Sequence, residues 1–90
     1  MVIGGRKIMI KITRTELEGF FCMEAEGEWN EQTAMDFAEL TEGDIVAVSS
    51  DIEKIKGLCN DFMNEFAVPV EIICVDGVYM GIDSDIAREL

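Results

Sequence analysis

Carboxylates near the expected ends of strands and loops are the side chains whose type and spacing could support chemistry. The acids stand in two short clusters, one around Gly43 and one directly after Ile82. Hard divalent cations prefer oxygen ligands of this kind, above all where several carboxylates converge. The pattern therefore predicts a divalent-cation site. Its candidate ligands are Glu39, Glu42, Asp44, Asp83 and Asp85.

These acids also have ordinary structural interpretations, which stay open at the level of sequence. Asp83 and Asp85 suit the start of a helix, where carboxylates cap free amide groups and complement the helix dipole. Glu42 and Asp44 suit a polar turn. None of these segments has the alternating ligands and central glycine of the twelve-residue calcium loop.

Reaction chemistry has little support in the sequence. Histidine is absent, which removes the commonest general base near neutral pH and the commonest transition-metal ligand. No phosphate loop, nucleophile elbow or dinucleotide-binding glycine pattern occurs, since Gly4-Gly5 stands alone. We therefore expect the protein not to be an enzyme.

The chain is strongly acidic, with 19 acids against 7 bases and a formal net charge of −12. Residues 15–53 contain no lysine or arginine. Nucleic acids and anionic membranes both bind through cationic side chains, so we expect neither as a partner. The charge predicts a cation as partner, or a basic protein docked on an acidic face with Met9 or Phe20 as an apolar anchor.

The length and composition suit one acidic α+β domain over residues 1–90, with 49% hydrophobic residues available for its core. Three cysteines are widely spaced in apolar stretches, which favours buried thiols over disulfides or a zinc site. They are Cys22, Cys59 and Cys74. No apolar run of about 18 residues predicts a membrane span, and we expect a cytoplasmic protein.

Alternating apolar residues predict that the chain begins with a hairpin. The first strand covers residues 7–13 and the second covers 17–29, which sets Ile10 beside Phe21 across a two-residue turn. A longer or bulged connection is the alternative, because Thr15-Glu16 is a poor turn sequence. Met9, Phe20 and Cys22 would share the outward face, either under a helix or as an interface.

Helices and strands then alternate along the rest of the chain. Asn30 predicts the start of a helix that ends near Gly43. Residues 45–48 are all apolar, which predicts a strand covered on both faces and placed centrally in the sheet. Ser50 opens a capping box and predicts the start of the main helix. The apolar stripe of that helix is Ile52, Ile55, Leu58, Cys59, Phe62, Met63 and Phe66.

The C-terminal third predicts a hairpin. Residues 70–75 form a second apolar strand, reached from the first by a right-handed parallel crossover. Asp76-Gly77 is a strong turn signal, and residues 78–82 return antiparallel beside 70–75. Residues 83–85 then cap a last helical turn. We therefore expect a mixed sheet with helices packed on it.

This topology places the acids at two opposite sheet edges. Asp44 begins one strand and Asp83 follows the returning strand, so both should lie at the same edge, together with the neighbouring candidate ligands. At the other edge, Asp51 and Asp76 follow strand ends in the crevice where open α/β sheets usually bind ligands. This pair is the alternative cation site.

The segments Glu39-Leu-Thr-Glu-Gly-Asp44 and Asp76-Gly-Val-Tyr-Met-Gly-Ile-Asp-Ser-Asp85, together with the order of elements, resemble a small family of acidic proteins from methanogenic archaea. The resemblance spans the chain. It implies an α+β fold of about six short strands and two main helices. It also implies calcium binding, and so favours calcium over magnesium among the hard cations.

Two hypotheses follow. The first is weak calcium binding by clustered surface carboxylates, in a monomer or weak dimer. The alternative is a protein-interaction module whose acidic face docks a basic partner.

Overall fold

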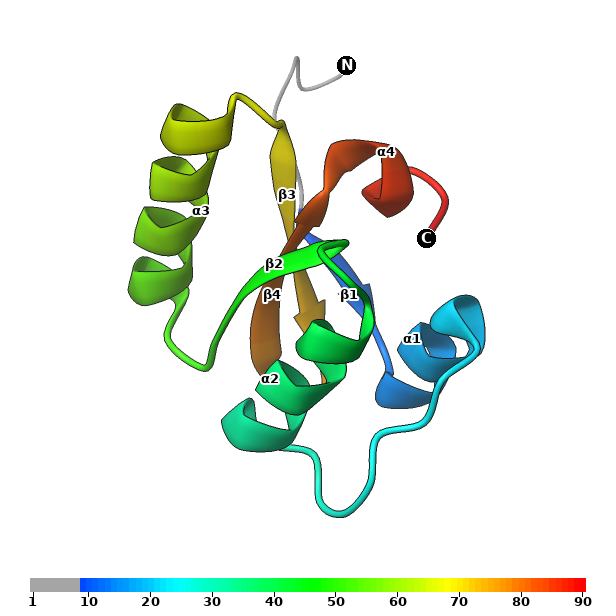
Figure 1. Ribbon diagram of the computed structural model, residues 1–90. Coiled ribbons are helices and arrows are strands. Elements are labelled where there is room, and N and C mark those ends of the chain that lie inside the picture. Colours follow the sequence, from blue (N-terminus) through cyan, green and yellow to red (C-terminus); the bar gives the residue numbers. More distant parts are fainter. Residues whose placement is uncertain (1–8) are drawn as a thin grey trace, which may run out of the picture.

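The computed structural model describes residues 9–90 as a four-stranded mixed sheet with four helices (Figure 1). The mixed α+β class is confirmed, but the expected six strands are too many. The elements in chain order are β1 (Ile10–Ile12), α1 (Arg14–Phe21), α2 (Glu31–Leu40), β2 (Ile45–Ser49), α3 (Ile52–Phe66), β3 (Val70–Val75), β4 (Val78–Asp83) and α4 (Ser84–Ala87).

The strands are ordered β1-β3-β4-β2 across the sheet. β1 runs parallel to β3, and β4 runs antiparallel to both of its neighbours, β3 and β2. The hairpin of β3 and β4 is confirmed, with its turn at Asp76 and Gly77, where φ is 44° and 90°. Asp83 caps α4, also as expected.

Helices cover the sheet on both faces. Side chains alternate along β3 and β4, so successive residues of one strand pack against helices on opposite faces. Ile73 and Met80 point into the main core, which they share with Leu17 of α1 and Phe37 of α2. Gly81 faces the opposite side and lies against Cys59 of α3. Figure 1 accordingly shows α3 on one side of the sheet and α1 and α4 on the other.

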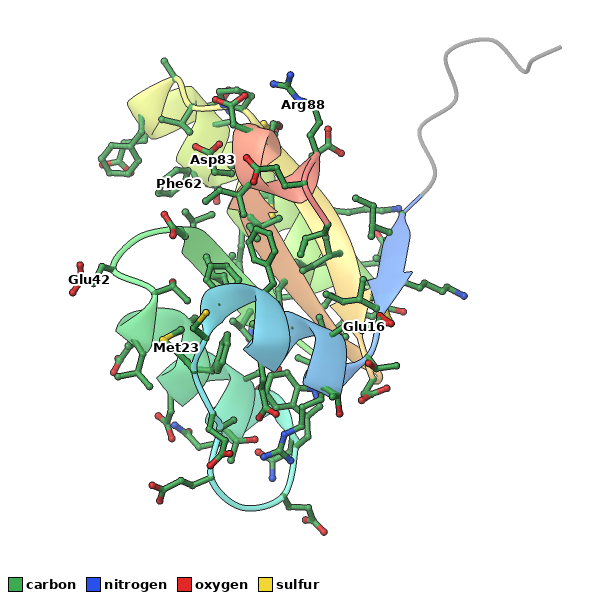
Figure 2. The ribbon with its side chains drawn as sticks, turned by 90° about the vertical axis from the view of Figure 1, so that its right-hand side faces the viewer. Glu16, Met23, Glu42, Phe62, Asp83 and Arg88 are labelled. Carbon is green, nitrogen blue, oxygen red and sulfur yellow. The ribbon has the colours of Figure 1, made fainter. Side chains whose placement is uncertain are left out.

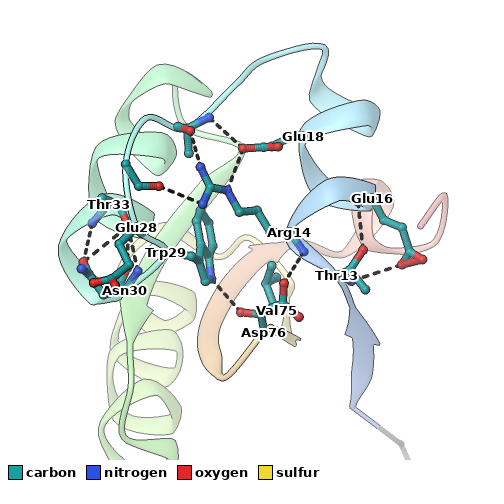
Figure 3. Close-up of polar contacts among 12 residues, drawn as sticks. Thr13, Arg14, Glu16, Glu18, Glu28, Trp29, Asn30, Thr33, Val75 and Asp76 are labelled. Atoms are coloured by element: carbon teal, nitrogen blue, oxygen red, sulfur yellow. Dashed lines mark hydrogen bonds and ion pairs between the residues drawn. The ribbon is translucent and has the colours of Figure 1, made fainter.

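The predicted N-terminal hairpin is wrong, because residues 14–21 form helix α1. Thr13 accepts the Glu16 N–H, and the Glu16 carboxylate accepts the Thr13 N–H in return (Figure 3). This capping box satisfies two amides that a helix start leaves free. Ile10 therefore lies beside Ile73 rather than Phe21. Residues 7 and 8 of the predicted strand lie outside the described residues.

The predicted outward patch is wrong for the same reason. Phe20 lies on α1 and is 38% exposed, while Cys22 ends that helix in a left-handed conformation. All three cysteines are free thiols, and only Cys59 is buried as expected; Cys22 is exposed and Cys74 is half-buried. Burial raises the pKa of the Cys59 thiol.

The predicted start of α2 is confirmed, and that of α3 needs a correction of one residue. Asn30 caps α2 and exchanges hydrogen bonds with Thr33. The N-cap of α3 is Asp51, whose carboxylate accepts the N–H groups of the first turn. Ser50 instead donates its amide and hydroxyl to Glu31 of α2, which lowers the pKa of Glu31.

The apolar run of residues 45–48 is strand β2, but it lies at the edge of the sheet and not at its centre. Both α2 and α3 pack on β2, so helices on both faces account for its apolar character. β2 and β3 run in the same direction, with β4 between them. Placing β2 at the edge leaves one side of its backbone outside the sheet.

Candidate functional site

The predicted cation ligands lie around the start of β2 and the start of α4. The strand ends that the sequence assigns to one sheet edge do meet, since the Asp83 N–H donates to the Asp44 carbonyl at 3.2 Å. The Asp83 carboxylate accepts the Asp85 N–H at 2.8 Å, and the Asp85 carboxylate pairs with Arg88. These two carboxylates therefore have partners in α4 or at its C-cap.

The remaining candidates point elsewhere. Glu42 is exposed in a turn with a φ of 57°, and Figure 2 shows its side chain directed away from the body of the protein. Glu39 lies on α2 and lines a groove described below. Within residues 9–90, no three His, Cys, Asp or Glu side chains are grouped so that they could hold a metal ion.

The alternative pair, Asp51 and Asp76, caps helix starts. Asp51 accepts the N–H groups of Glu53 and Lys54 at the start of α3. Asp76 accepts the N–H of Arg14, the first residue of α1, at 2.8 Å. Each carboxylate thus complements the positive end of a helix dipole. Their positions have a structural explanation without a cation.

A groove of about 560 Å³ lies along β2 between α2 and α3, and Figure 1 shows β2 between these two helices. Residues 45–48 of β2 contribute its floor. α2 contributes Met35, Ala38 and Glu39 from one side, and α3 contributes Leu58, Asp61, Phe62 and Glu65 from the other. The groove thus follows the free edge of the sheet.

The walls of this groove are largely apolar and open to solvent. Met35 is 44% exposed and Leu58 is 39% exposed. Phe62 also lines the groove from α3 and is labelled in Figure 2. Its ring centroid is 4.7 Å from that of Phe66, which is 55% exposed. Contiguous exposed apolar side chains with a polar rim are typical of interaction sites. Single exposed ones are ordinary.

The charged groups of the groove are all carboxylates. Glu39 stands on the α2 side, and Asp61 and Glu65 stand on the α3 side. No lysine or arginine lines the groove within residues 9–90. Like charges raise the local concentration of cations and favour a partner of opposite sign. Lysine and arginine side chains of a partner fit this surface in two ways. Their apolar stems can pack on the apolar walls, and their charged ends can reach the carboxylates.

A second concentration of polar contacts surrounds Arg14 (Figure 3). Its Nε donates to Glu18 at 2.9 Å, and its other guanidinium nitrogens donate to the carbonyls of Ala25 and Gly27. The guanidinium also lies over the Trp29 ring, 5.6 Å from its centroid, an arrangement that stabilises a cation on an aromatic face.

These contacts tie the loop between α1 and α2 to the sheet. The Ala25 N–H donates to Glu18, and together with Arg14 it lowers the pKa of that carboxyl group. Trp29 donates its indole N–H to the carbonyl of Val75 at 2.8 Å. Because the polar groups bond to one another, the cluster works as a structural clamp and offers little to a ligand.

Sequence reasoning identified only part of the groove. Leu58 and Phe62 belong to the predicted apolar stripe, but Met35, Asp61 and Glu65 were not singled out. A usable signal was the width of the stripe on α3. Of its seven apolar residues, only Ile55 and Cys59 are buried. When the apolar stripe of a helix is wider than the face that packs on the sheet, some apolar side chains stay exposed beside that face and can contact a partner.

Within the described part of the chain, no helix is long and apolar enough to cross a membrane. None of the protein-family models, curated proteins or solved structures compared with this chain matches it.

Proposed function

We propose that the protein is an interaction module that docks a basic partner protein in the groove between α2 and α3. The observation that carries the proposal is the composition of the groove, in which exposed apolar walls and carboxylates occur together and none of the described residues contributes a cationic side chain. The apolar walls supply affinity through burial. The carboxylates select the sign of the partner's charge and accelerate encounter.

The net charge of −12 strengthens this selection. The whole molecule attracts a basic partner and repels an acidic one, and the groove adds the apolar surface that holds the partner in place. The proposal assigns the protein no reaction.

A peptide titration followed by amide chemical shifts tests the proposal. The probe is a capped peptide of about six alternating lysines and valines, the length of an ordinary strand. We expect shifts centred on the residues of the groove. Leu58→Ala should weaken binding, whereas Phe20→Ala should not, because Phe20 is equally exposed but lies on α1 outside the groove.

The charge contribution has its own matched control. Replacing Glu39, Asp61 and Glu65 by their amides should weaken binding and flatten its dependence on salt. The same change at Glu24, Glu26 and Glu28, which removes as much charge elsewhere, should have a smaller effect. If the two triple variants have equal effects, or if the shifts spread over all acidic surfaces, the binding is unspecific charge attraction and the proposal is contradicted.

Calcium binding at the start of β2 is the second candidate. The meeting of Asp44 and Asp83 favours it, and the resemblance to acidic archaeal proteins points the same way. Calcium should then raise the melting temperature more than sodium chloride of equal ionic strength. Asp83→Asn should remove the excess while preserving the helix cap, since asparagine also caps well. Coincident melting curves would rule this candidate out.

A further inference from the structure

The free edge of β2 lacks most of the devices that protect an exposed strand from pairing. Proteins usually protect sheet edges with charged residues, proline, very short strands or bulges. The opposite edge strand, β1, has only three residues and carries Lys11. β2 has five residues, Ile45–Ser49, without a charge or a proline. Its one device is a bulge between Ile45 and Ala47.

Among the described residues, the main chain of residues 46–48 also has no partner on the free side of β2, whereas the Ile45 N–H donates to the Thr41 hydroxyl at 3.1 Å. Alternate N–H and C=O groups of an edge strand point away from its neighbour. In β2 these groups face away from β4, at the edge where residues 45–48 line the groove.

The two walls of the groove lie on opposite faces of the sheet. Phe37 of α2 is buried in the core on one face, and Cys59 of α3 lies against Gly81 on the other. Neighbouring strands are about 4.8 Å apart, and packed layers are about 10 Å apart. An extended segment in the groove would therefore continue the plane of the sheet, with a helix on each side.

We infer that the partner binds as an added β-strand, hydrogen-bonded to the free edge of β2. This inference rests on the proposed function and names the form of the partner, which is an extended basic segment of another protein. Main-chain hydrogen bonds supply affinity in such complexes, and alternate side chains supply specificity. One set of side chains would face Met35 on α2, and the other would face Leu58 and Phe62 on α3.

The negative charge of the protein favours a different, basic protein as the partner over a second copy of this chain. Two copies pairing through β2 would bring two acidic grooves together, each on a molecule with a net charge of −12. A segment with lysines or arginines between apolar residues reduces this repulsion, because its cations can reach the carboxylates of the wall that they face, either Glu39 on α2 or Asp61 and Glu65 on α3. The bulge at Ile45 and Ala47 confines regular pairing to a short stretch, so the added strand is short.

N-methylation of the probe peptide isolates the contribution of the main chain. A lysine–valine peptide with methylated amides keeps its charge and side chains but loses its backbone donors. We expect it to bind at least about tenfold more weakly than the unmethylated peptide, which corresponds to about one net hydrogen bond. The unmethylated peptide should slow hydrogen exchange at residues 46–48 and give cross-strand nuclear Overhauser effects to them.

The outcomes separate the two proposals. If both peptides bind equally and the groove charges still matter, strand addition is wrong and docking in the groove stands. If neither peptide binds, or if Leu58→Ala leaves binding unchanged, both proposals fail. If sedimentation shows that the chain alone dimerises and hydrogen exchange places the contact at residues 46–48, the partner is a second copy and the inferred partner class is wrong.

Discussion

Glu18 and Glu31 each hold two segments of the chain together through hydrogen bonds to backbone N–H groups. Glu18 binds the Ala25 amide and the Arg14 guanidinium, and Glu31 binds the Ser50 amide and hydroxyl. These bonds favour the ionised carboxylate, which is why the pKa of each lies below its ordinary value of 4.5.

A lowered pKa in the folded protein links stability to pH with a definite sign. The stabilisation is fully present above the unfolded-state pKa, and it is lost as the pH falls through the folded-state value. Glu18→Gln should therefore lower the free energy of unfolding at neutral pH and make its decline below pH 4.5 shallower. Urea unfolding at a series of pH values measures both effects.

Glu53→Gln is the control for this prediction, because the Glu53 side chain is 82% exposed and its pairing with Lys56 at 3.8 Å is loose. At neutral pH the control should change the free energy of unfolding much less than Glu18→Gln does. A Glu18→Gln variant with the wild-type profile would show that the Arg14 clamp does not depend on the ionised carboxylate.

At the scale of the element, the N-cap of α3 lies one residue later than the sequence predicted. Asp51, and not Ser50, accepts the free amides of the first turn. Asp51→Ala should cost about 1 kcal/mol of unfolding free energy, the usual value of a lost cap. Asp51→Asn should cost much less. Ser50→Ala removes only the exposed hydroxyl bond to Glu31, so a larger cost for it than for Asp51→Ala would contradict the assignment.

Close packing between α3 and the sheet is the basis of a second prediction at this scale. A Cβ atom added to Gly81 would clash with the Cys59 sulfur and come within 3.2 Å of Val70. Gly81→Ala should therefore destabilise the protein by about 1–3 kcal/mol through overpacking. Chemical denaturation measures the cost.

The double variant identifies the cause. Removing the sulfur with Cys59→Ala makes room for the new methyl group, so the two substitutions together should cost less than the sum of their separate costs by at least about 0.5 kcal/mol. Strict additivity would show that the clash is relieved in some other way, for instance by rotation of the cysteine side chain.

At the scale of the whole molecule, the net charge of −12 works against folding. Like charges repel in the compact state, and salt screens them. The Debye length falls from about 30 Å at 0.01 M salt to about 8 Å at 0.15 M, and the radius of gyration is 12.7 Å. Sodium chloride should therefore raise the free energy of unfolding over this range. An unchanged value would show that the acids are too dispersed to repel significantly.

Local signals in the sequence determined much of the fold correctly. The cap at Asn30, the turn at Asp76 and Gly77, and the helical period of α3 depend on residues within a few positions of one another. Their interactions form in nearly the same way whatever the rest of the chain does. The mixed α+β class follows from these elements. The sequence also places Asp44 and Asp83 at the same end of the sheet, but their direct contact depends on the antiparallel pairing of β2 with β4.

Residues 14–21 show where local signals compete. The alternation that begins at Leu17 suits a strand, but Thr13 and Glu16 also form a capping box that suits a helix. Only the tertiary structure decided between them. β1 finds its partner in β3, more than 60 residues later in the sequence, and Leu17 of α1 is then buried in the core. No local pattern contains that pairing.

The position of the groove at a free sheet edge was beyond the reach of the sequence. An apolar run such as residues 45–48 reveals that both faces of a strand are covered, but covered faces do not distinguish a central strand from an edge strand beneath two helices. Strand order depends on which distant pairings together bury the most apolar surface. Here that balance placed β4 between β3 and β2, and so left the edge of β2 open between α2 and α3.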